Sequence, residues 1–210
     1  MNVQDIPRGD DYAGMALIDA ATALLAGRRH DIPADFVAKL FGLAVPEDLE
    51  RYRAEELADI AERSWSFLAE RRPGVPKLRF EPAAAPRGIA VLEIVNDDMP
   101  FLADSVVGEL NQRGLDIRLF VHPVFVVERD AAGGLTNFKG ARTIGGQRES
   151  FIHAHVDGAE DAAQRADIVH ALDSILADVR VCVQDWQPML GRVRGVIAEL
   201  RDNPPPLPVD

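Results

Sequence analysis

The chain has 210 residues, of which 47% are hydrophobic, and it carries a formal net charge of −11 at pH 7. This length can bury a sizeable core, and an ordinary apolar share argues against global disorder. A strongly acidic chain is a poor nucleic-acid binder, because phosphate backbones are neutralised by lysine and arginine. The single cysteine, Cys182, excludes an internal disulfide and a cysteine-based metal site, and it fits a reducing cytoplasm.

The start of the chain gives no sign of export or membrane insertion. Its first residues, MNVQDIPRGDDY, are acidic and lack the apolar core of a secretion signal. No apolar run approaches the about 20 residues that a membrane-spanning helix needs. We therefore expect a soluble cytoplasmic protein that has neither a membrane nor a nucleic acid as a partner.

The first third of the chain shows apolar residues at helical spacing, which predicts three helices. The first covers 11–26, and the second buries Phe36, Val37, Leu40 and Phe41. The third begins near Pro46 and keeps its apolar stripe as far as Leu68. We predict an N-terminal helical segment over 1–74, followed by a proline-containing connector over 75–88 that can hold a short edge strand at 77–80.

Residues 89–129 read as one β-α-β unit. A short β-branched run from Ile89 predicts a strand, and Asn96-Asp97-Asp98 stops it with side chains that favour turns. Asp98 is the predicted N-cap of the next helix, with Pro100 in the first turn. Gly114 is expected to end that helix in the left-handed conformation. A second strand follows, which His122-Pro123 should bend because proline cannot donate to a ladder.

The remaining elements are predicted from the same signals. A turn at 130–134 leads into a glycine-rich exposed loop over 135–147, and a third strand over 149–156 pairs antiparallel with the second. The last helix should continue through 181–183, where a ferredoxin-like fold would have its fourth strand, and be kinked or restarted at Pro188. Its stripe around Trp186 is most simply core, with a share available for another subunit. Residues 203–210 form a proline-rich tail or linker.

Two motifs carry a family resemblance. The order strand, acidic turn, proline, apolar helix, glycine, strand resembles the ACT domain, a ferredoxin-like regulatory module. More narrowly, VNDDMPFLADSV followed by VHPVFVVERDAAGGL resembles the N-terminal region of the large bacterial NAD-specific glutamate dehydrogenases. The flanking VPEDLERYRAEELADIAERSWSFLAERRPG and VRVCVQDWQPM fit the same family, so the resemblance extends from about Tyr12 to Leu200.

The resemblance implies an α+β fold, with an ACT-like antiparallel sheet over 89–202 that carries its helices on one face. It also implies a non-catalytic N-terminal module for allosteric regulation or oligomerisation of an enzyme of amino-acid metabolism. That parent oxidoreductase converts L-glutamate and NAD to 2-oxoglutarate and ammonia. Its NAD site would lie outside this chain, and the module's partners would be the remaining polypeptide and the other subunits of a homo-oligomer. A free-standing ACT-type amino-acid sensor is the alternative.

ACT domains hold amino-acid effectors beside the loop between the first strand and the first helix. On that basis the candidate effector-binding residues are Asn96, Asp97, Asp98, Met99, Phe101 and His122. The helix N-terminus would offer N–H groups to a carboxylate, and an acid would hold the ammonium group. Phe101 stands where ligand-binding ACT domains typically have glycine and would fill the space, which favours assembly. The same turn is also explained as a purely structural helix cap.

Other chemistry finds weaker support. The sequence contains no G-x-G-x-x-G motif and no phosphate-binding loop, so no cofactor-binding or catalytic residue is assigned. His153 and His155 are two apart on a predicted strand and share one face, but no third metal ligand has a recognisable spacing. Histidines satisfied by ordinary hydrogen bonds are the preferred interpretation. A small enzyme that uses His153, His155 and an acid is the third functional class left open.

Overall fold

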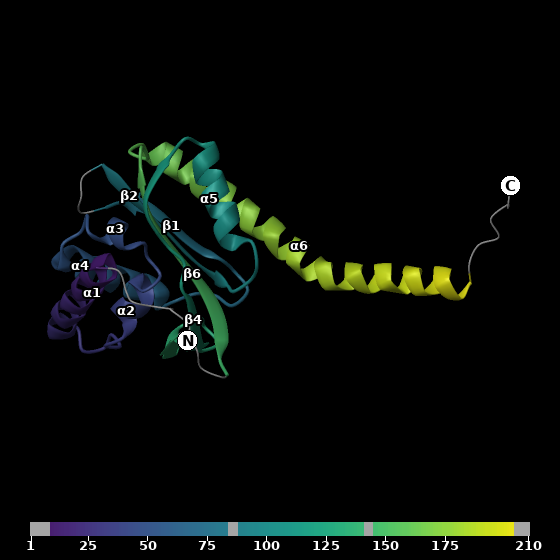
Figure 1. The fold of residues 1–210 in the computed structure, drawn as a ribbon, viewed down its shortest axis with the longest axis horizontal. Coiled ribbons are helices and arrows are strands. Elements are labelled where there is room, and N and C mark those ends of the chain that lie inside the picture. Colours follow the sequence, from purple (N-terminus) through teal and green to yellow (C-terminus); the bar gives the residue numbers. More distant parts are fainter. Residues whose placement is uncertain (1–8, 84–87, 141–144, 204–210) are drawn as a thin grey trace.

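A computed structural model describes residues 9–83, 88–140 and 145–203 and shows an α+β fold. A six-stranded antiparallel sheet lies between two groups of helices (Figure 1). One buried cluster joins the N-terminal helices to one face of the sheet, and a second joins α5 and α6 to the opposite face. The expected ACT-like arrangement, with the helices that follow the first strand on one face, is confirmed.

The N-terminal segment forms helices α1 (Gly9–Arg28), α2 (Phe36–Phe41), α3 (Pro46–Leu49) and α4 (Ala54–Leu68). The four apolar side chains predicted for the second helix are all buried. The predicted single third helix is wrong, because the chain breaks between α3 and α4. Arg53 is extended there, and its backbone N–H donates to Glu56 Oε2 at 2.8 Å, which starts a new helix. The break turns Tyr52 into the core.

The strands are β1 (Lys77–Pro82), β2 (Ile89–Asp97), β3 (Asp116–Val121), β4 (Val124–Arg129), β5 (Leu135–Gly140) and β6 (Gln147–Asp157). Their order is β1-β2-β6-β4-β5, and β3 pairs with β6 beyond the end of β4. The bend predicted at His122-Pro123 is the break between β3 and β4. There the carbonyl of Pro123 accepts the Phe151 N–H at 2.9 Å, so the connection stays bound to β6.

The prediction of an exposed loop over 135–147 is wrong, because its first part forms β5, which pairs antiparallel with β4. Leu135 and Phe138 pack against the core beneath the N-terminal helices, so this segment buries apolar surface despite its glycines. Asp130 builds the tight turn between the two strands by accepting the backbone N–H groups of Ala132 and Gly134. Part of the predicted loop, 141–144, lies outside the described residues.

Strand β1 lies in the segment predicted as a connector and forms the edge of the sheet beside β2, where an edge strand was expected. It takes the place that a fourth strand following the second helix would fill in a ferredoxin-like fold. Because that edge is occupied, α6 (Ala162–Asp202) can remain helical through 181–183, as predicted. The domain boundaries at 75 and 88 stay a prediction.

The turn before helix α5 (Leu102–Gln112) differs from the expected cap. The helix begins after Phe101, which has a left-handed φ of 71°, and no side chain caps it. Asp98 instead pairs with Arg148, and Pro100 precedes the helix rather than lying in its first turn. Gly114, with φ 71°, ends the helix in the left-handed conformation as predicted.

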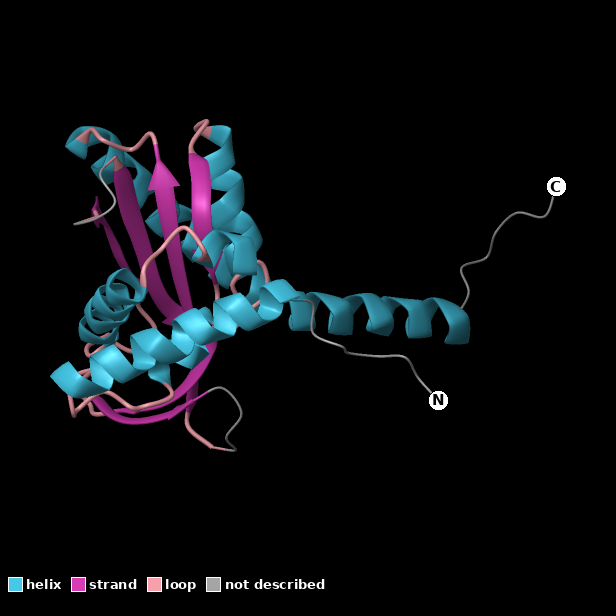
Figure 2. Ribbon diagram, turned by 60° about the vertical axis from the view of Figure 1, so that its left-hand side comes forward, coloured by secondary structure: helices cyan, strands magenta, loops and turns pink. Residues whose placement is uncertain are grey.

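Helix α6 has 41 residues and contains Pro188. Its first part packs on the sheet and on α5, and its second part extends away from the rest of the chain (Figures 1 and 2). Trp186 is 58% exposed, so the expectation that its stripe belongs to the core is wrong. The predicted tail from 204 onward lies outside the described residues. Among the helices that the structure describes, none combines the length and apolarity needed to cross a bilayer.

Candidate functional site

The sheet face beneath α4 carries buried polar side chains, and strand alternation puts them there. Along β6, Phe151, His153 and His155 face the N-terminal helices, while Ile152 and Ala154 face α5 and α6. The predicted shared face of the two histidines is therefore what the structure shows. Their neighbours across the sheet were not predicted.

Cross-strand pairing aligns these groups into two rows. Glu93 on β2 lies opposite both Arg79 on β1 and His153 on β6. In the second row, Val91 lies between Glu81 and His155. Antiparallel partners have adjacent side chains on one face, so each row brings its members into contact.

Glu93 is the centre of the first row and is buried. Its Oε1 accepts the Ser64 hydroxyl at 2.8 Å and lies 3.2 Å from His153 Nδ1, and its Oε2 accepts Arg79 Nε at 2.9 Å. Burial raises the pKa of Glu93, but the hydrogen bonds with His153 and Arg79, together with the charge of Arg79, outweigh it and lower that pKa to about 2. The carboxylate therefore remains ionised at neutral pH.

His155 is buried in the second row, and its Nδ1 lies 2.7 Å from the Tyr52 hydroxyl. Burial, with a smaller contribution from the neighbouring His153, lowers the pKa of His155 to about 3. Burial also raises the pKa of Tyr52 to about 12. Both groups are therefore uncharged at neutral pH, unlike Arg79 and Glu93, which form an ion pair in the first row.

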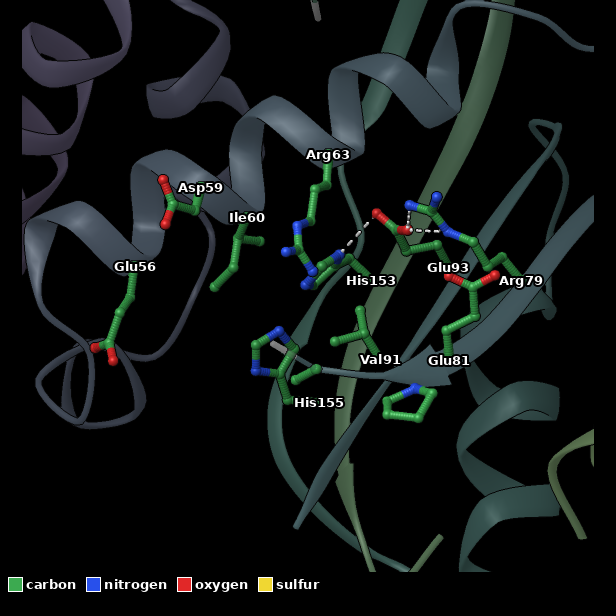
Figure 3. Close-up of a pocket in the computed structure, with 12 residues that line it drawn as sticks. Glu56, Asp59, Ile60, Arg63, Arg79, Glu81, Val91, Glu93, His153 and His155 are labelled. Carbon is green, nitrogen blue, oxygen red and sulfur yellow. Dashed lines mark hydrogen bonds and ion pairs between the residues drawn. The ribbon is translucent and has the colours of Figure 1, made fainter. Parts of the chain in front are cut away.

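A cavity of about 100 Å³ lies between these rows and α4 (Figure 3). Glu56, Asp59, Ile60 and Arg63 form its wall on α4, at the spacing that puts residues on one helix face. The Nε2 atoms of His153 and His155 are buried without a hydrogen-bond partner among the described residues. Within the same residues, no group of three or more His, Cys, Asp or Glu side chains is arranged to hold a metal ion.

The turn predicted to bind an effector lies at the other end of β2. Asp97 accepts Arg71 Nη2 at 2.6 Å, Arg180 Nη1 at 2.7 Å and Gln147 Nε2 at 2.8 Å. Burial raises the pKa of Asp97, but the arginine hydrogen bonds outweigh it and lower that pKa. Asn96 is buried and its Oδ1 accepts Arg180 Nη2 at 2.8 Å. Both side chains are thus held from within the chain.

The other candidate residues of the turn do not converge on one space. Asp98 pairs with Arg148, and Met99 packs against the apolar cluster beneath α5. The Phe101 side chain is 65% exposed, so the expectation that it fills the space beside the turn is wrong. His122 bonds Ser150 on β6, and burial lowers the pKa of His122. Effector binding by these residues stays a prediction.

A buried charge network beside the turn was not predicted from the sequence. Glu149 accepts Arg71 Nε at 2.9 Å and Arg129 Nε at 2.8 Å, and all three side chains are at least 98% buried. Arg71 also reaches Asp97, and Asp97 reaches Arg180 on α6. The chain of contacts joins the end of the N-terminal helical segment to the helix that leaves the sheet.

Sequence signals for the polar face exist but are faint. Glu93 is the lone acid in the apolar run IAVLEIV, and buried charges require partners. That position could have been marked as unusual. The partners Ser64, Arg79 and Tyr52 come from distant parts of the chain, and only tertiary packing brings them together.

Comparison with known proteins agrees with this architecture. The family model described as "Glutamate dehydrogenase, ACT1 domain" matches residues 36–172. An NAD-specific glutamate dehydrogenase of Halomonas elongata is 33% identical over 179 residues, covering 81% of this chain and 11% of that protein. The enzyme of the same name from Pseudomonas aeruginosa is 28% identical over 172 residues, covering 79% of this chain and 11% of that protein. The chain belongs to the family of glutamate dehydrogenase ACT1 domains.

Proposed function

We propose that this chain is a non-catalytic N-terminal module that assembles the subunits of a large NAD-dependent glutamate dehydrogenase. In this proposal the parent enzyme converts L-glutamate and NAD to 2-oxoglutarate and ammonia with residues outside the chain. The chain spans 11% of the length of the two relatives named above, which leaves ample sequence for catalysis elsewhere. The proposal rests on one observation, the apolar stripe of α6.

Apolar residues follow α6 at strictly alternating spacings of four and three. The positions are Ile168, Leu172, Ile175, Val179, Cys182, Trp186, Met189, Val193, Val196 and Leu200. This is the heptad spacing of a coiled-coil seam. Ile168 and Leu172 are buried against the sheet and α5. Trp186 and the later members of the stripe do not belong to that buried cluster.

The exposed part of the seam is large enough to need a partner. Trp186 is 58% exposed and Met189 is 57% exposed, on a helix that extends away from the sheet (Figure 2). Soluble chains seldom leave contiguous large apolar side chains in water, because burying them is worth about 1.5–3 kcal/mol each. A second copy of α6 offers the same heptad stripe and fits it by symmetry.

The turn predicted to bind an effector also favours assembly. The Asp97 carboxylate already binds two arginines, so an effector's ammonium group would have to displace one of them. This feature favours assembly over amino-acid sensing at this turn.

Light scattering on the 23.0 kDa chain tests self-association. We expect an oligomer for the unmodified chain and a monomer for Val193→Glu, because a charge in the seam is costly to bury. Val181→Glu is the matched control, since Val181 has 56% exposure against 54% for Val193 but lies off the seam. A monomeric unmodified chain, or equal dissociation by both variants, would contradict the proposal.

The link to a parent enzyme has its own test. Antibody against this domain should detect, in a denaturing gel of cell extract, a band several-fold heavier than 23.0 kDa. A band at 23.0 kDa would contradict the module assignment and move the free-standing sensor ahead.

A further inference from the structure

We propose that the cavity beneath α4 binds a small carboxylic acid whose neighbouring carbon carries a hydrogen-bond donor, either an amine or a hydroxyl. The site is formed by Arg63, His153 and His155. It lies at the opposite end of β2 from the turn that holds Asp97, and it does not depend on the assembly function.

His155 supplies a buried N–H donor to the cavity. The Tyr52 hydroxyl is protonated at neutral pH and its only hydrogen-bond partner among the described residues is His155 Nδ1, at 2.7 Å. We assign the hydroxyl proton to that contact, because a buried donor without an acceptor is costly. A neutral imidazole then carries its own proton on Nε2, which has no partner within the described chain. Nε2 is therefore a donor at the cavity.

His153 supplies the complementary acceptor. Its Nδ1 lies 3.2 Å from Glu93 Oε1, and an ionised carboxylate can only accept, so Nδ1 carries the proton. A neutral imidazole with its proton on Nδ1 has a lone pair on Nε2. The Nε2 of His153 is also buried without a partner in the described residues. The two histidine rings have centroids 4.9 Å apart. A donor and an acceptor thus lie side by side, which suits a ligand that bears both functions on adjacent atoms.

Arg63 provides the charge that a carboxylate needs. It makes no ion pair or hydrogen bond among the described residues, and its side chain extends from α4 toward the two histidines (Figure 3). Three other charged neighbours are paired: Arg79 with Glu93, Asp59 with Arg28 and Glu56 with Arg53. The remaining charged residue of the lining, Glu81, is an acid and cannot hold a carboxylate. Arg63 is the guanidinium left for a ligand, and its planar fork matches two carboxylate oxygens.

Size and charge narrow the ligand further. About 100 Å³ admits a molecule of few heavy atoms, such as a three-carbon acid. The acids Glu56, Asp59 and Glu81 line the same cavity, so a singly charged carboxylate meets less repulsion than doubly charged phosphate. In the proposed arrangement the carboxylate accepts from Arg63 and His155 Nε2, and the neighbouring amine or hydroxyl donates to His153 Nε2.

Histidine NMR signals of the full chain test this site. L-alanine, L-lactate, propionate and phosphate are titrated separately at constant ionic strength. We expect alanine or lactate to move the His153 and His155 signals saturably while the exposed His30 and His170 stay still. The stronger of these two probes identifies the donor as amine or hydroxyl. Propionate, which lacks the donor, and phosphate should bind at least about tenfold more weakly, as expected for a lost hydrogen bond to a charged or buried group.

Two variants complete the test. Arg63→Gln should weaken binding by about tenfold or more, because the charged partner is lost. Arg72→Gln makes the same change at an exposed arginine outside the cavity and should bind as the unmodified chain does. Unchanged binding in Arg63→Gln, equal binding of propionate, equal or stronger binding of phosphate, or parallel movement of all five histidines would overturn the proposal. Absence of saturation with both alanine and lactate would also overturn it.

Discussion

The two faces of the sheet are built from alternate residues of the same strands, yet they differ in kind. On the face beneath α5 and α6, β6 presents Ile152, Ala154 and Val156, and the buried cluster there is apolar. On the face beneath α4, the same strand presents His153 and His155 between apolar neighbours. Strand β6 therefore contributes to an apolar core on one face and to a core with buried polar groups on the other.

The difference shows which part of the fold tolerates substitutions and which part depends on particular contacts. An apolar face needs suitable volume, and volume-conserving exchanges in such a core usually cost little. A buried polar group needs its own partner, because losing that partner leaves a charge or donor without compensation. The face beneath α4 is thus the place where a substitution should act through a named contact, and it is also the face that holds the cavity.

The largest effect should come from the buried network on the polar face. Glu149→Gln keeps the shape of the side chain but removes the charge between Arg71 and Arg129, which are both buried. We expect the free energy of unfolding to fall by about 3–5 kcal/mol, the cost of breaking a buried ion pair. Urea unfolding measures it. Glu128→Gln, at a partly exposed pair with Lys139, is the control and should change little. A small loss in Glu149→Gln would show that the network tolerates an uncompensated cation.

The apolar face gives the next effect, and α6 supplies a matched pair for it. Leu176 is 1% exposed and packs against the sheet, whereas Leu200 is 52% exposed on the same helix. Leu176→Ala should lower the free energy of unfolding by about 2–4 kcal/mol through a cavity in the core. Leu200→Ala should lower it much less at concentrations where the chain is monomeric. Equal losses in urea unfolding would mean that the distal helix is packed in solution even in the monomer.

Acid should destabilise the polar face through His155. The pKa of this side chain is about 3 in the fold against 6.5 for an ordinary histidine, so between these pH values the unfolded chain binds a proton that the folded chain does not. The free energy of unfolding therefore falls as the pH falls, by at most about 1.4 kcal/mol per pH unit, or about 2 kcal/mol from pH 6.5 to 5. Below 4.5, the lowered pKa of Glu93 adds a loss of the same sign.

His155→Gln isolates this contribution, because glutamine is polar but does not titrate. The variant should show a shallower fall of the unfolding free energy between pH 6.5 and 4.5, measured by urea unfolding at a series of pH values. Titrating groups that do not interact with His155 are shared with the unmodified chain, so their contributions cancel in the comparison. An identical slope in both proteins would mean that His155 takes up its proton without unfolding the chain.

The apolar face was the more predictable of the two. Ile168 and Leu172 follow helical spacing, and Ile152, Ala154 and Val156 alternate along a strand, so local pattern alone places them. The unpredicted break after Tyr52 and the strand β5 both depend on contacts with the sheet that no local window contains. Apolar residues keep helical spacing from Leu49 to Leu57, which predicts one helix. The capping interaction of Arg53 starts a separate helix between them.

The polar face was predictable only in part. The shared direction of His153 and His155 follows from their spacing, but their burial does not, since histidine is as often exposed as buried. Glu93, Tyr52, Ser64 and Arg63 meet around them from three separate segments. Asp97 was predicted as a ligand group, whereas its nearest charges are Arg71 and Arg180 of the chain itself.

The smallest effect is expected at Phe101, in the turn between β2 and α5. This residue belongs to neither buried cluster. Phe101 has a φ of 71°, a conformation that costs a residue with a Cβ about 1–2 kcal/mol, and its ring is 65% exposed. Phe101→Gly should relieve that strain, partly offset by the greater freedom of glycine in the unfolded chain, for a net gain of about 0.5 kcal/mol. Thermal unfolding measures the gain. Phe101→Ala removes the same ring but keeps the strain, so it should give no increase. An equal gain in both variants would place the cost in the exposed ring rather than in the backbone.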